Sequence, residues 1–380
     1  MTLRIPLARP EITDADREAV MEVLRTPHLS AGPKVTEFER AICNYTGATH
    51  AVAVNSGTSA LQLAIRTLAI EPSAEVILPS FTFSAVLNGI LQEGLRPSFV
   101  DVDPRTYNCT AEDMLAAITP ETRLIIAVHT FGFPVDVMAI LQGVRSRGGE
   151  RIYVIEDACE ALGADVCGVK AGTLGDAGLF AFYPNKQITT GEGGMLVTSN
   201  ERIAQTAARL RNQGRDLELG WNSHAEVGYS YRIPDINCAL GISQLARIED
   251  VIARRQALAE IYDRELAGVP EIVRPGLTSE IGRISWFVYP VQLAAQFTLE
   301  DRDQICEAMQ SRGIATGKYF APLHRQPVLC KGGPRPTLPN TEFVADRVIA
   351  LPFFNELTEA EIQDVCRTLV DSIHELRRKT

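Results

Sequence analysis

Seven short runs rich in β-branched and aromatic residues recur between residues 50 and 200 and alternate with helical patterns. They read HAVAVN, EVILPS, RPSFVDV, RLIIAVH, RIYVIEDA, GLFAFY and GMLVTS. Several are apolar almost throughout, which is typical of strands covered on both faces. Between the first two runs, a helical pattern places Leu61, Ala64, Ile65 and Leu68 on one face. The alternation predicts an α/β domain with a mostly parallel seven-stranded sheet sandwiched by helices.

A second, smaller unit is expected after this sheet. A helical pattern runs from about Asp235 to Leu266 and could carry the chain out of the first domain. Beyond it, SWFVYPVQL reads as a strand and DRDQICEAMQSRGI as a helix, and a last helix opens with a Thr-x-x-Glu capping box at Thr358. We therefore expect a large domain over residues 1–250, N-terminal segment included, and a small C-terminal α+β domain over residues 251–380.

Composition excludes several classes of protein. No apolar run approaches the roughly 20 residues that span a bilayer, and the N-terminus turns acidic too soon for a signal peptide. The net charge of −10 argues against a nucleic-acid partner. No His/Cys cluster has metal-ligand spacing. We expect a cytoplasmic protein without a metal, in which a phosphate-bearing ligand is held by local amides.

One lysine stands in an unusual setting, within the stretch GLFAFYPNKQITTGEGG. Lys186 follows an apolar run and Pro184, and it precedes two threonines and a glycine-rich turn. A lysine that served only solubility would need none of these neighbours. The setting favours a reactive amine where a strand ends.

Two other segments offer what a reactive lysine would need. After one strand, Ser56, Gly57 and Thr58 lead directly into a helix, whose free amides and two hydroxyls could hold a phosphate. A simple Ser/Thr cap is the more common role of such a segment.

Another strand ends on Asp157, at the edge where open α/β sheets bind ligands. Because a carboxylate at this depth is costly unless it meets a cation, Asp157 could pair with a pyridinium nitrogen.

These pieces fit one cofactor, pyridoxal 5′-phosphate. Lysine binds it as a Schiff base, an aspartate pairs with its ring nitrogen, and a helix N-terminus holds its phosphate. Phe83, in PSFTF after another strand, could stack on the ring, although such a phenylalanine is more often part of the core. Dinucleotide, Walker and G-x-S-x-G motifs are absent from the sequence.

With these residues in place, the sequence resembles the DegT–StrS-type nucleotide-sugar aminotransferases, pyridoxal-phosphate enzymes of fold type I. The motifs that carry the resemblance occur in the right order over nearly the whole chain. They are PHLSAGPKVTEFE, NSGTSAL, PSFTF, FVDVDPRTYN, VHTFGFPVD, EDACEALGA, FYPNKQITTGEGG, YRIPDINCALGISQL and YFAPLH. The resemblance implies a homodimer with shared active sites.

The resemblance also implies roles around the cofactor ring. Lys186 would bind the cofactor covalently and then move a proton between the donor carbon and the cofactor. Asp157 would pair with the pyridine nitrogen, and Phe83 would take the ring-stacking place. Glu160 stands where many members have a glutamine near the cofactor's 3-hydroxyl group.

The phosphate contacts follow the family in part. Gly57 and Thr58 match residues that hold the phosphate, and Asn237 matches an asparagine that reaches the phosphate of the neighbouring subunit. Many members have a serine five residues before the lysine, and here that position is Ala181. One hydroxyl contact is therefore missing, and Ser56 or a water could replace it.

The reaction implied is a ping-pong transamination. An amino acid, glutamate or glutamine, gives its amino group to the cofactor, and the resulting pyridoxamine 5′-phosphate aminates a ketone on a nucleotide-linked sugar. KQITTGEGGM and WNSHAEVGYSYRIPDIN look more like members that aminate C4 of a 4-keto-6-deoxy hexose than like those that act at C3. Candidates for contacts to the sugar or diphosphate are Tyr319, His324, His129 and His224. For each histidine, a structural or surface role is equally compatible with the sequence.

Three alternatives are weighed against this interpretation. A pyridoxamine-dependent sugar dehydratase on the same scaffold has histidine in place of the lysine, so Lys186 argues against it. An aminotransferase for a cyclic ketone such as an inosose stays open, as does amination at C3. A non-catalytic regulatory relative is disfavoured because the lysine, the aspartate and the phosphate loop are all retained.

Overall fold

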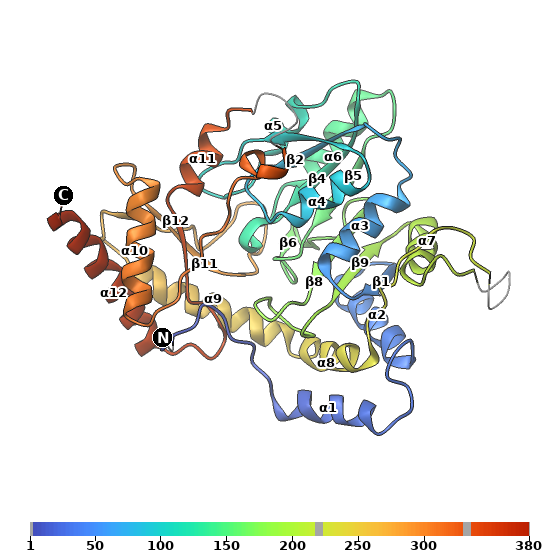
Figure 1. The fold of residues 1–380 in the computed structure, drawn as a ribbon, viewed down its shortest axis with the longest axis horizontal. Helices are drawn as coiled ribbons and strands as arrows, with labels where there is room; N and C mark the ends of the chain where they lie inside the picture. The colour runs from blue at the N-terminus through green and yellow to red at the C-terminus, as the bar shows by residue number, and fades with distance from the viewer. Residues whose placement is uncertain (1–2, 217–222, 330–335, 380) are drawn as a thin grey trace.

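The computed structural model describes residues 3–216, 223–329 and 336–379 and shows a seven-stranded central sheet (Figure 1). Its strands, in the order β1-β9-β8-β5-β4-β2-β3, are β1 (His50–Val54), β9 (Gly194–Thr198), β8 (Ala177–Ala181), β5 (Tyr153–Asp157), β4 (Thr122–Val128), β2 (Glu75–Pro79) and β3 (Arg96–Val100). Neighbouring strands are parallel except where β9 pairs with β1 and with β8. Each of the seven predicted runs forms one strand, so the α/β fold with a mostly parallel sheet is confirmed.

Helices cover both faces of this sheet because side chains alternate along its strands. Val52 and Val54 of β1 pack into one hydrophobic cluster, while Ala53 between them packs into another. The helices of the larger part are α1 (Asp14–Leu24), α2 (Pro33–Thr46), α3 (Gly57–Thr67), α4 (Ala85–Gln92), α5 (Ala111–Ala116), α6 (Val137–Arg147), α7 (Glu201–Arg211), α8 (Asp235–Leu245) and α9 (Ile248–Glu265).

A second, three-stranded antiparallel sheet lies at the other end of the molecule, on the left of Figure 1. It consists of β10 (Ile272–Val273), β11 (Tyr289–Leu293) and β12 (Val348–Leu351), and it is accompanied by α10 (Leu299–Ser311), α11 (Pro339–Ala345) and α12 (Glu359–Lys379). The predicted capping box before α12 is present, since Thr358 Oγ1 accepts from the Glu361 N–H and Glu361 Oε2 accepts from the Thr358 N–H. The division of the chain at residue 250 stays a prediction, and that position lies within α9.

Short elements complete the described chain. They are the β6 (Asp165–Val166) and β7 (Val169–Lys170) hairpin and the 3-10 turns η1 (Thr130–Gly132), η3 (Leu323–Arg325) and η4 (Pro327–Leu329). Within the described ranges, no helix combines the length and apolar character needed to cross a membrane.

The long helix predicted from Asp235 to Leu266 is in fact two helices. α8 ends at Leu245 and α9 begins at Ile248, and Arg247 between them has a non-helical backbone with φ of −116°. The Arg247 guanidinium binds the Glu11 carbonyl at 2.7 Å and its carboxylate at 3.0 Å. The N-terminal segment therefore ties down the break, a contact that helical periodicity cannot reveal.

The predicted strand SWFVYPVQL is also shorter than expected, because only its second half forms β11. Its first half pairs instead with the loop after β4. There, the Ser285 N–H donates to the Gly132 carbonyl at 3.1 Å and the Phe287 N–H to the Phe131 carbonyl at 3.2 Å. This pairing brings the segment before β11 to the edge of the central sheet.

Candidate active site

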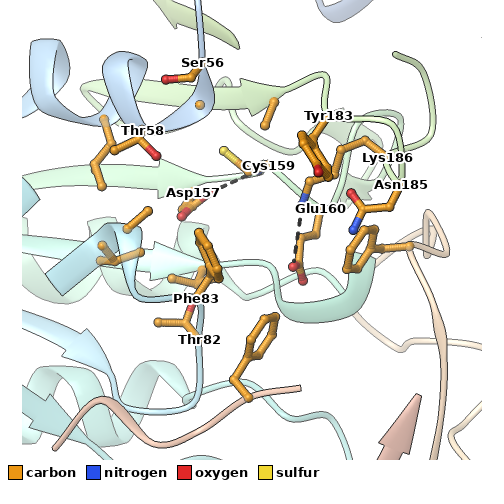
Figure 2. Close-up of a pocket in the computed structure, with 18 of the residues that line it drawn as sticks. Ser56, Thr58, Thr82, Phe83, Asp157, Cys159, Glu160, Tyr183, Asn185 and Lys186 are labelled. Carbon is orange, nitrogen blue, oxygen red and sulfur yellow. Dashed lines mark hydrogen bonds and ion pairs between the residues drawn. The ribbon is translucent and has the colours of Figure 1, made fainter. Parts of the chain in front are cut away.

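A cavity of about 380 Å³ opens at the carboxyl edge of the central sheet (Figure 2). Since β1, β8, β5, β4 and β2 run in the same direction, their carboxyl ends meet at this edge, where α/β sheets bind ligands. The sequence-predicted residues that line the cavity are Ser56, Gly57, Thr58, Phe83, Asp157, Glu160, Lys186 and Tyr319. Residues far apart in the sequence are thus brought together as the motifs predicted.

One end of the cavity is formed by the start of α3. Ser56 is the N-cap, and its Oγ accepts from the Ser59 N–H at 3.1 Å. The Ser59 hydroxyl donates to Asn55 Oδ1, so the hydrogen of Ser56 is directed to Ser59 Oγ at 2.9 Å. The capping role is therefore confirmed for Ser56, and its hydroxyl is not free to replace a missing phosphate contact.

Glycine is required at the first position of α3. A Cβ on Gly57 would lie 2.7 Å from the Cβ of Ala181 and 3.2 Å from Cys159 Sγ. The helix end thus packs directly on the ends of β8 and β5. The first-turn amides of Gly57 and Thr58 have no intrahelical acceptor, and the exposed Thr58 lines the cavity beside them. This arrangement suits an anion.

The two neighbouring acids at the end of β5 have different surroundings. The side chain of Glu156 is fully buried and accepts the N–H groups of Gly172, Leu174 and Gly175 at 2.6–2.8 Å. Asp157 lines the cavity, and its Oδ1 accepts the Cys159 N–H at 3.0 Å (Figure 2). Glu156 therefore fixes a loop, and Asp157 is free to meet a cation.

Lys186 reaches the cavity from the loop after β8, and its side chain is only 14% exposed. Its Nζ lies 3.7 Å from Glu160 Oε1 and 4.2 Å from the centre of the Phe287 ring. Glu160 Oε2 accepts the Phe131 N–H at 2.8 Å. Burial raises the pKa of the Glu160 carboxyl, and the charge of Lys186 opposes this rise. The amine is thus held between a carboxylate and an aromatic face.

Aromatic side chains surround the mouth of the cavity. Phe83 is 59% exposed and stands 6.5 Å from Phe320 between ring centres. Tyr319 stacks on Phe287 at 6.2 Å, and burial raises the pKa of its hydroxyl. Phe83 is therefore not a core residue, and a planar or sugar ring entering the cavity would meet several aromatic faces.

Two predicted substrate contacts are corrected by the structure. The side chain of His129 is fully buried, and its Nδ1 accepts the Val135 N–H at 3.0 Å, which leaves Nε2 to donate to Glu156 at 3.2 Å. The side chain of His324 is also fully buried, with Nδ1 2.6 Å from Ser80 Oγ and Nε2 3.2 Å from a carboxylate oxygen of Glu342. Neither histidine lines the cavity, and the burial and hydrogen bonds of both indicate a structural role.

Two further predicted residues lie outside this cavity. His224 is exposed and its Nδ1 donates to the Gln213 carbonyl at 2.9 Å; residues 221 and 222, which begin the same motif, lie outside the described residues. The Asn237 amide donates to the carbonyls of Thr190 at 2.6 Å and Glu192 at 3.1 Å. In this single chain both N–H groups of the Asn237 amide are used within its own chain. The expected contact is to the phosphate of a neighbouring subunit, and it stays a prediction.

Sequence reasoning missed several residues of the cavity wall. Tyr183 and Asn185 lie inside the lysine motif and Phe320 inside YFAPLH, so the quoted motifs already contained them. Phe287 carried no such signal, because it arrives from a segment about a hundred residues after Lys186. Among the described residues, no group of three or more His, Cys, Asp or Glu side chains could hold a metal ion.

Comparison with known proteins decides the family. The model of the DegT/DnrJ/EryC1/StrS aminotransferase family matches residues 10–370. The chain belongs to this family. The predicted family and the predicted enzyme class, aminotransferase, are thereby confirmed.

Relatives within this aminotransferase family match along almost the full length. The chain is 36% identical to the GDP-perosamine synthase of Caulobacter vibrioides over 367 residues, which cover 96% of this chain and 97% of that protein. A Streptococcus pneumoniae protein described as a sugar aminotransferase, solved in a PMP-form, superposes with a TM-score of 0.92 at 27% identity and 99% coverage of both chains. A PLP-form of it has also been solved. The Helicobacter pylori aminotransferase involved in the biosynthesis of pseudoaminic acid superposes with a TM-score of 0.92 at 25% identity. The match covers 98% of this chain and 99% of that chain.

Proposed function

We propose that this protein is a pyridoxal-phosphate-dependent sugar aminotransferase. It moves an amino group from an amino acid, glutamate or glutamine, to the C4 keto group of a nucleotide-linked keto-deoxy sugar. The observation that carries this proposal is the cavity in which Lys186, Asp157 and the first turn of α3 face one another. The PLP- and PMP-forms of the pneumococcal relative support the cofactor.

The side chains present fit that cofactor. The α3 N-terminus offers unpaired amides to a phosphate, Asp157 offers a carboxylate to a pyridinium nitrogen, and Lys186 offers an amine to an aldehyde. Gly57 packs closely on Ala181 and Cys159, so the start of α3 is fixed at the wall of the cavity. When bound, the cofactor supplies an electron sink for the carbon that loses its proton.

Lys186 holds the cofactor through its Nζ and then acts as general base and general acid in both halves of the reaction. Glu160 and the Phe287 ring, which flank Nζ, direct the amine into the cavity and exclude water from it. Asp157 keeps the ring nitrogen protonated, because a carboxylate favours the charged form of a neighbouring base. Phe83, which is exposed at the mouth, would pack on the face of the ring.

The phosphate is held mainly by the main chain in this proposal. Ala181 lacks the hydroxyl that many relatives have at its position, and the Ser56 hydroxyl is engaged with Ser59. Donors that the described residues offer there are the amides of Gly57 and Thr58 and the Thr58 hydroxyl, all at the positive end of α3.

The substrate assignment rests on the sequence motifs and on the relatives. GDP-perosamine synthase bears the name of a nucleotide-linked amino sugar, and it matches nearly the whole chain. Tyr319 and Phe320 in the wall of the cavity offer a hydroxyl and apolar faces to a sugar ring. We further propose a cytoplasmic homodimer in which each active site is completed by the partner subunit.

A panel of ketones tests the substrate. The purified enzyme is supplied with glutamate or glutamine and, in turn, with a nucleotide-linked 4-keto-6-deoxy hexose, a 3-keto isomer and an inosose. We expect consumption of the donor only with nucleotide-linked sugars and a product whose new amine lies on C4 by NMR. Amination solely at C3, or solely of the inosose, contradicts the assignment of the substrate while leaving the aminotransferase activity intact.

A further inference from the structure

A buried arginine on α9 lies directly behind the candidate active site. Arg255 is only 4% exposed, and burial lowers its pKa to about 10, so it stays charged at neutral pH. Its Nε donates to Asn355 Oδ1 at 3.1 Å. Its terminal nitrogens donate to the main-chain carbonyls of Trp286 at 3.2 Å, Phe287 at 3.1 Å and Lys186 at 3.4 Å. All four acceptors are uncharged oxygens.

Two of these carbonyls belong to Lys186 and Phe287, whose side chains are also in contact with each other. Lys186 Nζ lies 4.2 Å from the centre of the Phe287 ring, and the guanidinium of Arg255 binds the carbonyls of both residues. Gln187 adds a second tie, since its amide donates to the carbonyls of Glu160 at 2.7 Å and Ser285 at 2.9 Å. The lysine loop and the segment before β11 are therefore joined at two points.

An arginine suits the task of joining these two segments better than it suits simple packing of the core. A charge in the interior is costly, and an apolar side chain of similar volume often stabilises a fold at least as well. A guanidinium, however, presents its donors in a rigid planar fork. Because the fork is rigid, the carbonyls that it binds are held at a fixed separation. A flexible ammonium group cannot impose this geometry.

We propose that Arg255 is a positioning residue for catalysis, which sets the lysine loop against Phe287 so that Lys186 Nζ is aimed into the cavity. This inference rests on the proposed function of Lys186. It predicts that loss of the fork displaces the amine without removing any group that touches the cofactor or the substrate.

Arg255→Lys tests the proposal because it keeps the charge and loses the fork. We expect the single-turnover rate of the donor half-reaction to fall about 100-fold, the effect of a misplacement on the order of 1 Å. The KM values for donor and sugar should change less than about twofold, because the groups that bind them remain. The visible circular dichroism band of the bound cofactor should change in size or sign, since it reports the geometry of attachment to Lys186.

Arg254→Lys is the matched control, because Arg254 is adjacent and exposed, and its hydrogen bonds to described residues go to the main-chain carbonyls of Asn355 and Leu357 rather than to the lysine loop. It should leave both readouts at wild-type values. Asn355→Ala removes the side-chain oxygen that accepts from Arg255 Nε, and it decides the question if Arg255→Lys does not fold. It should change the single-turnover rate and the dichroism band in the same direction as Arg255→Lys, but by a smaller amount.

Wild-type rates and an unchanged dichroism band in these variants, even with a lowered melting temperature, overturn the positioning role. A wild-type protein without a cofactor band overturns the proposed function as well, so the two failures are distinguishable.

Discussion

At the scale of the residue, two consecutive acids on one strand have opposite tasks. Glu156 is buried under the loop at residues 172–175, and Asp157 faces the cavity. Side chains alternate across a strand, so neighbouring residues on β5 must face different layers. The sequence predicts Asp157 as the ligand-binding acid, and the structure places Asp157, not Glu156, in the lining of the cavity.

This pair allows one matched comparison. Asp157→Asn should weaken cofactor binding by about 10- to 100-fold with little loss of stability, because a charge-assisted contact to the cofactor is lost. Glu156→Gln should lower the free energy of unfolding by about 1–3 kcal/mol, because its new N–H₂ group would face main-chain N–H donors. Cofactor titration and urea denaturation of both variants check this. Equal effects of the two variants on cofactor affinity would contradict the division of roles.

Glu160 gives a prediction of pH dependence. Burial raises the pKa of its carboxyl above the ordinary 4.5, so the folded protein keeps this proton to a higher pH than the unfolded chain does. As the pH rises above 4.5, the unfolded state therefore loses its proton first, and the stability contributed by the protonated group declines until the folded pKa is passed.

The measurement is urea denaturation of the cofactor-free protein from pH 4 upward, for the wild type and for Glu160→Gln. The wild type should lose stability relative to the variant through this window, because glutamine does not titrate. Curves that stay parallel, or a wild type that gains relative stability with rising pH, would show that Glu160 is not buried as a high-pKa acid.

The residues that sequence could identify at this scale share one property. Asp157 ends β5, Lys186 lies in the loop that follows β8, and Thr58 lies in the first turn of α3, so each stands at a junction between elements, and each residue type has specific chemistry. Phe287 could not be predicted, because a phenylalanine before a strand is usually core and its approach to Lys186 depends on the packing of a distant segment. His129 and His324 carry the same chemistry as catalytic histidines, and only burial shows their structural use.

At the scale of the element, the start of α3 combines a structural cap and a proposed phosphate contact within three residues. Ser56 is the N-cap of α3 and accepts the Ser59 N–H, while Thr58, two residues later, is exposed at the cavity. The family resemblance assigned the phosphate to Gly57 and Thr58, and the sequence left open whether Ser56 caps the helix or also contacts the phosphate. The hydrogen-bond network of Ser56 with Ser59 makes the assignment.

Removal of the Ser56 hydroxyl should therefore affect stability, and removal of the Thr58 hydroxyl should affect cofactor affinity. Ser56→Ala should lower the free energy of unfolding by about 1 kcal/mol, the usual value of an N-cap. Thr58→Ala should leave stability within about 0.5 kcal/mol and weaken cofactor binding about tenfold, since one donor to the phosphate is lost. Thermal melts of the cofactor-free proteins and cofactor titrations distinguish the two. A stable Ser56→Ala variant with tenfold weaker cofactor binding would reverse the assignment.

Strands proved more predictable than long helices. The seven runs of the central sheet are apolar and bounded by turns, and each forms the strand expected. The break between α8 and α9 escaped prediction because both helices keep an apolar face, and the break is held by Arg247 contacts to Glu11, more than two hundred residues earlier in the sequence. Contacts of this kind are set by the tertiary fold.

At the scale of the whole molecule, the cavity is lined by residues from distant parts of the chain. Asp157 comes from the end of β5, Lys186 from the loop after β8, and Phe287 from the segment leading into β11. Phe83 and Tyr183 leave large apolar surfaces exposed at the mouth. A partner subunit that covers this mouth is consistent with the proposed homodimer.

The proposed assembly is tested by light scattering of the purified protein. We expect a native mass twice the chain mass of 41.6 kDa. A monomer that retains full transamination activity would contradict the shared active site.

The most direct test of the function concerns the bond between Lys186 and the cofactor. The purified protein, loaded with pyridoxal phosphate, is reduced with borohydride, digested and measured by mass spectrometry, with Lys186→Ala as the control. We predict a yellow protein, loss of the colour on reduction, and the added cofactor mass on the peptide that contains Lys186. A colourless protein, or cofactor mass found only on another lysine, would contradict the assignment.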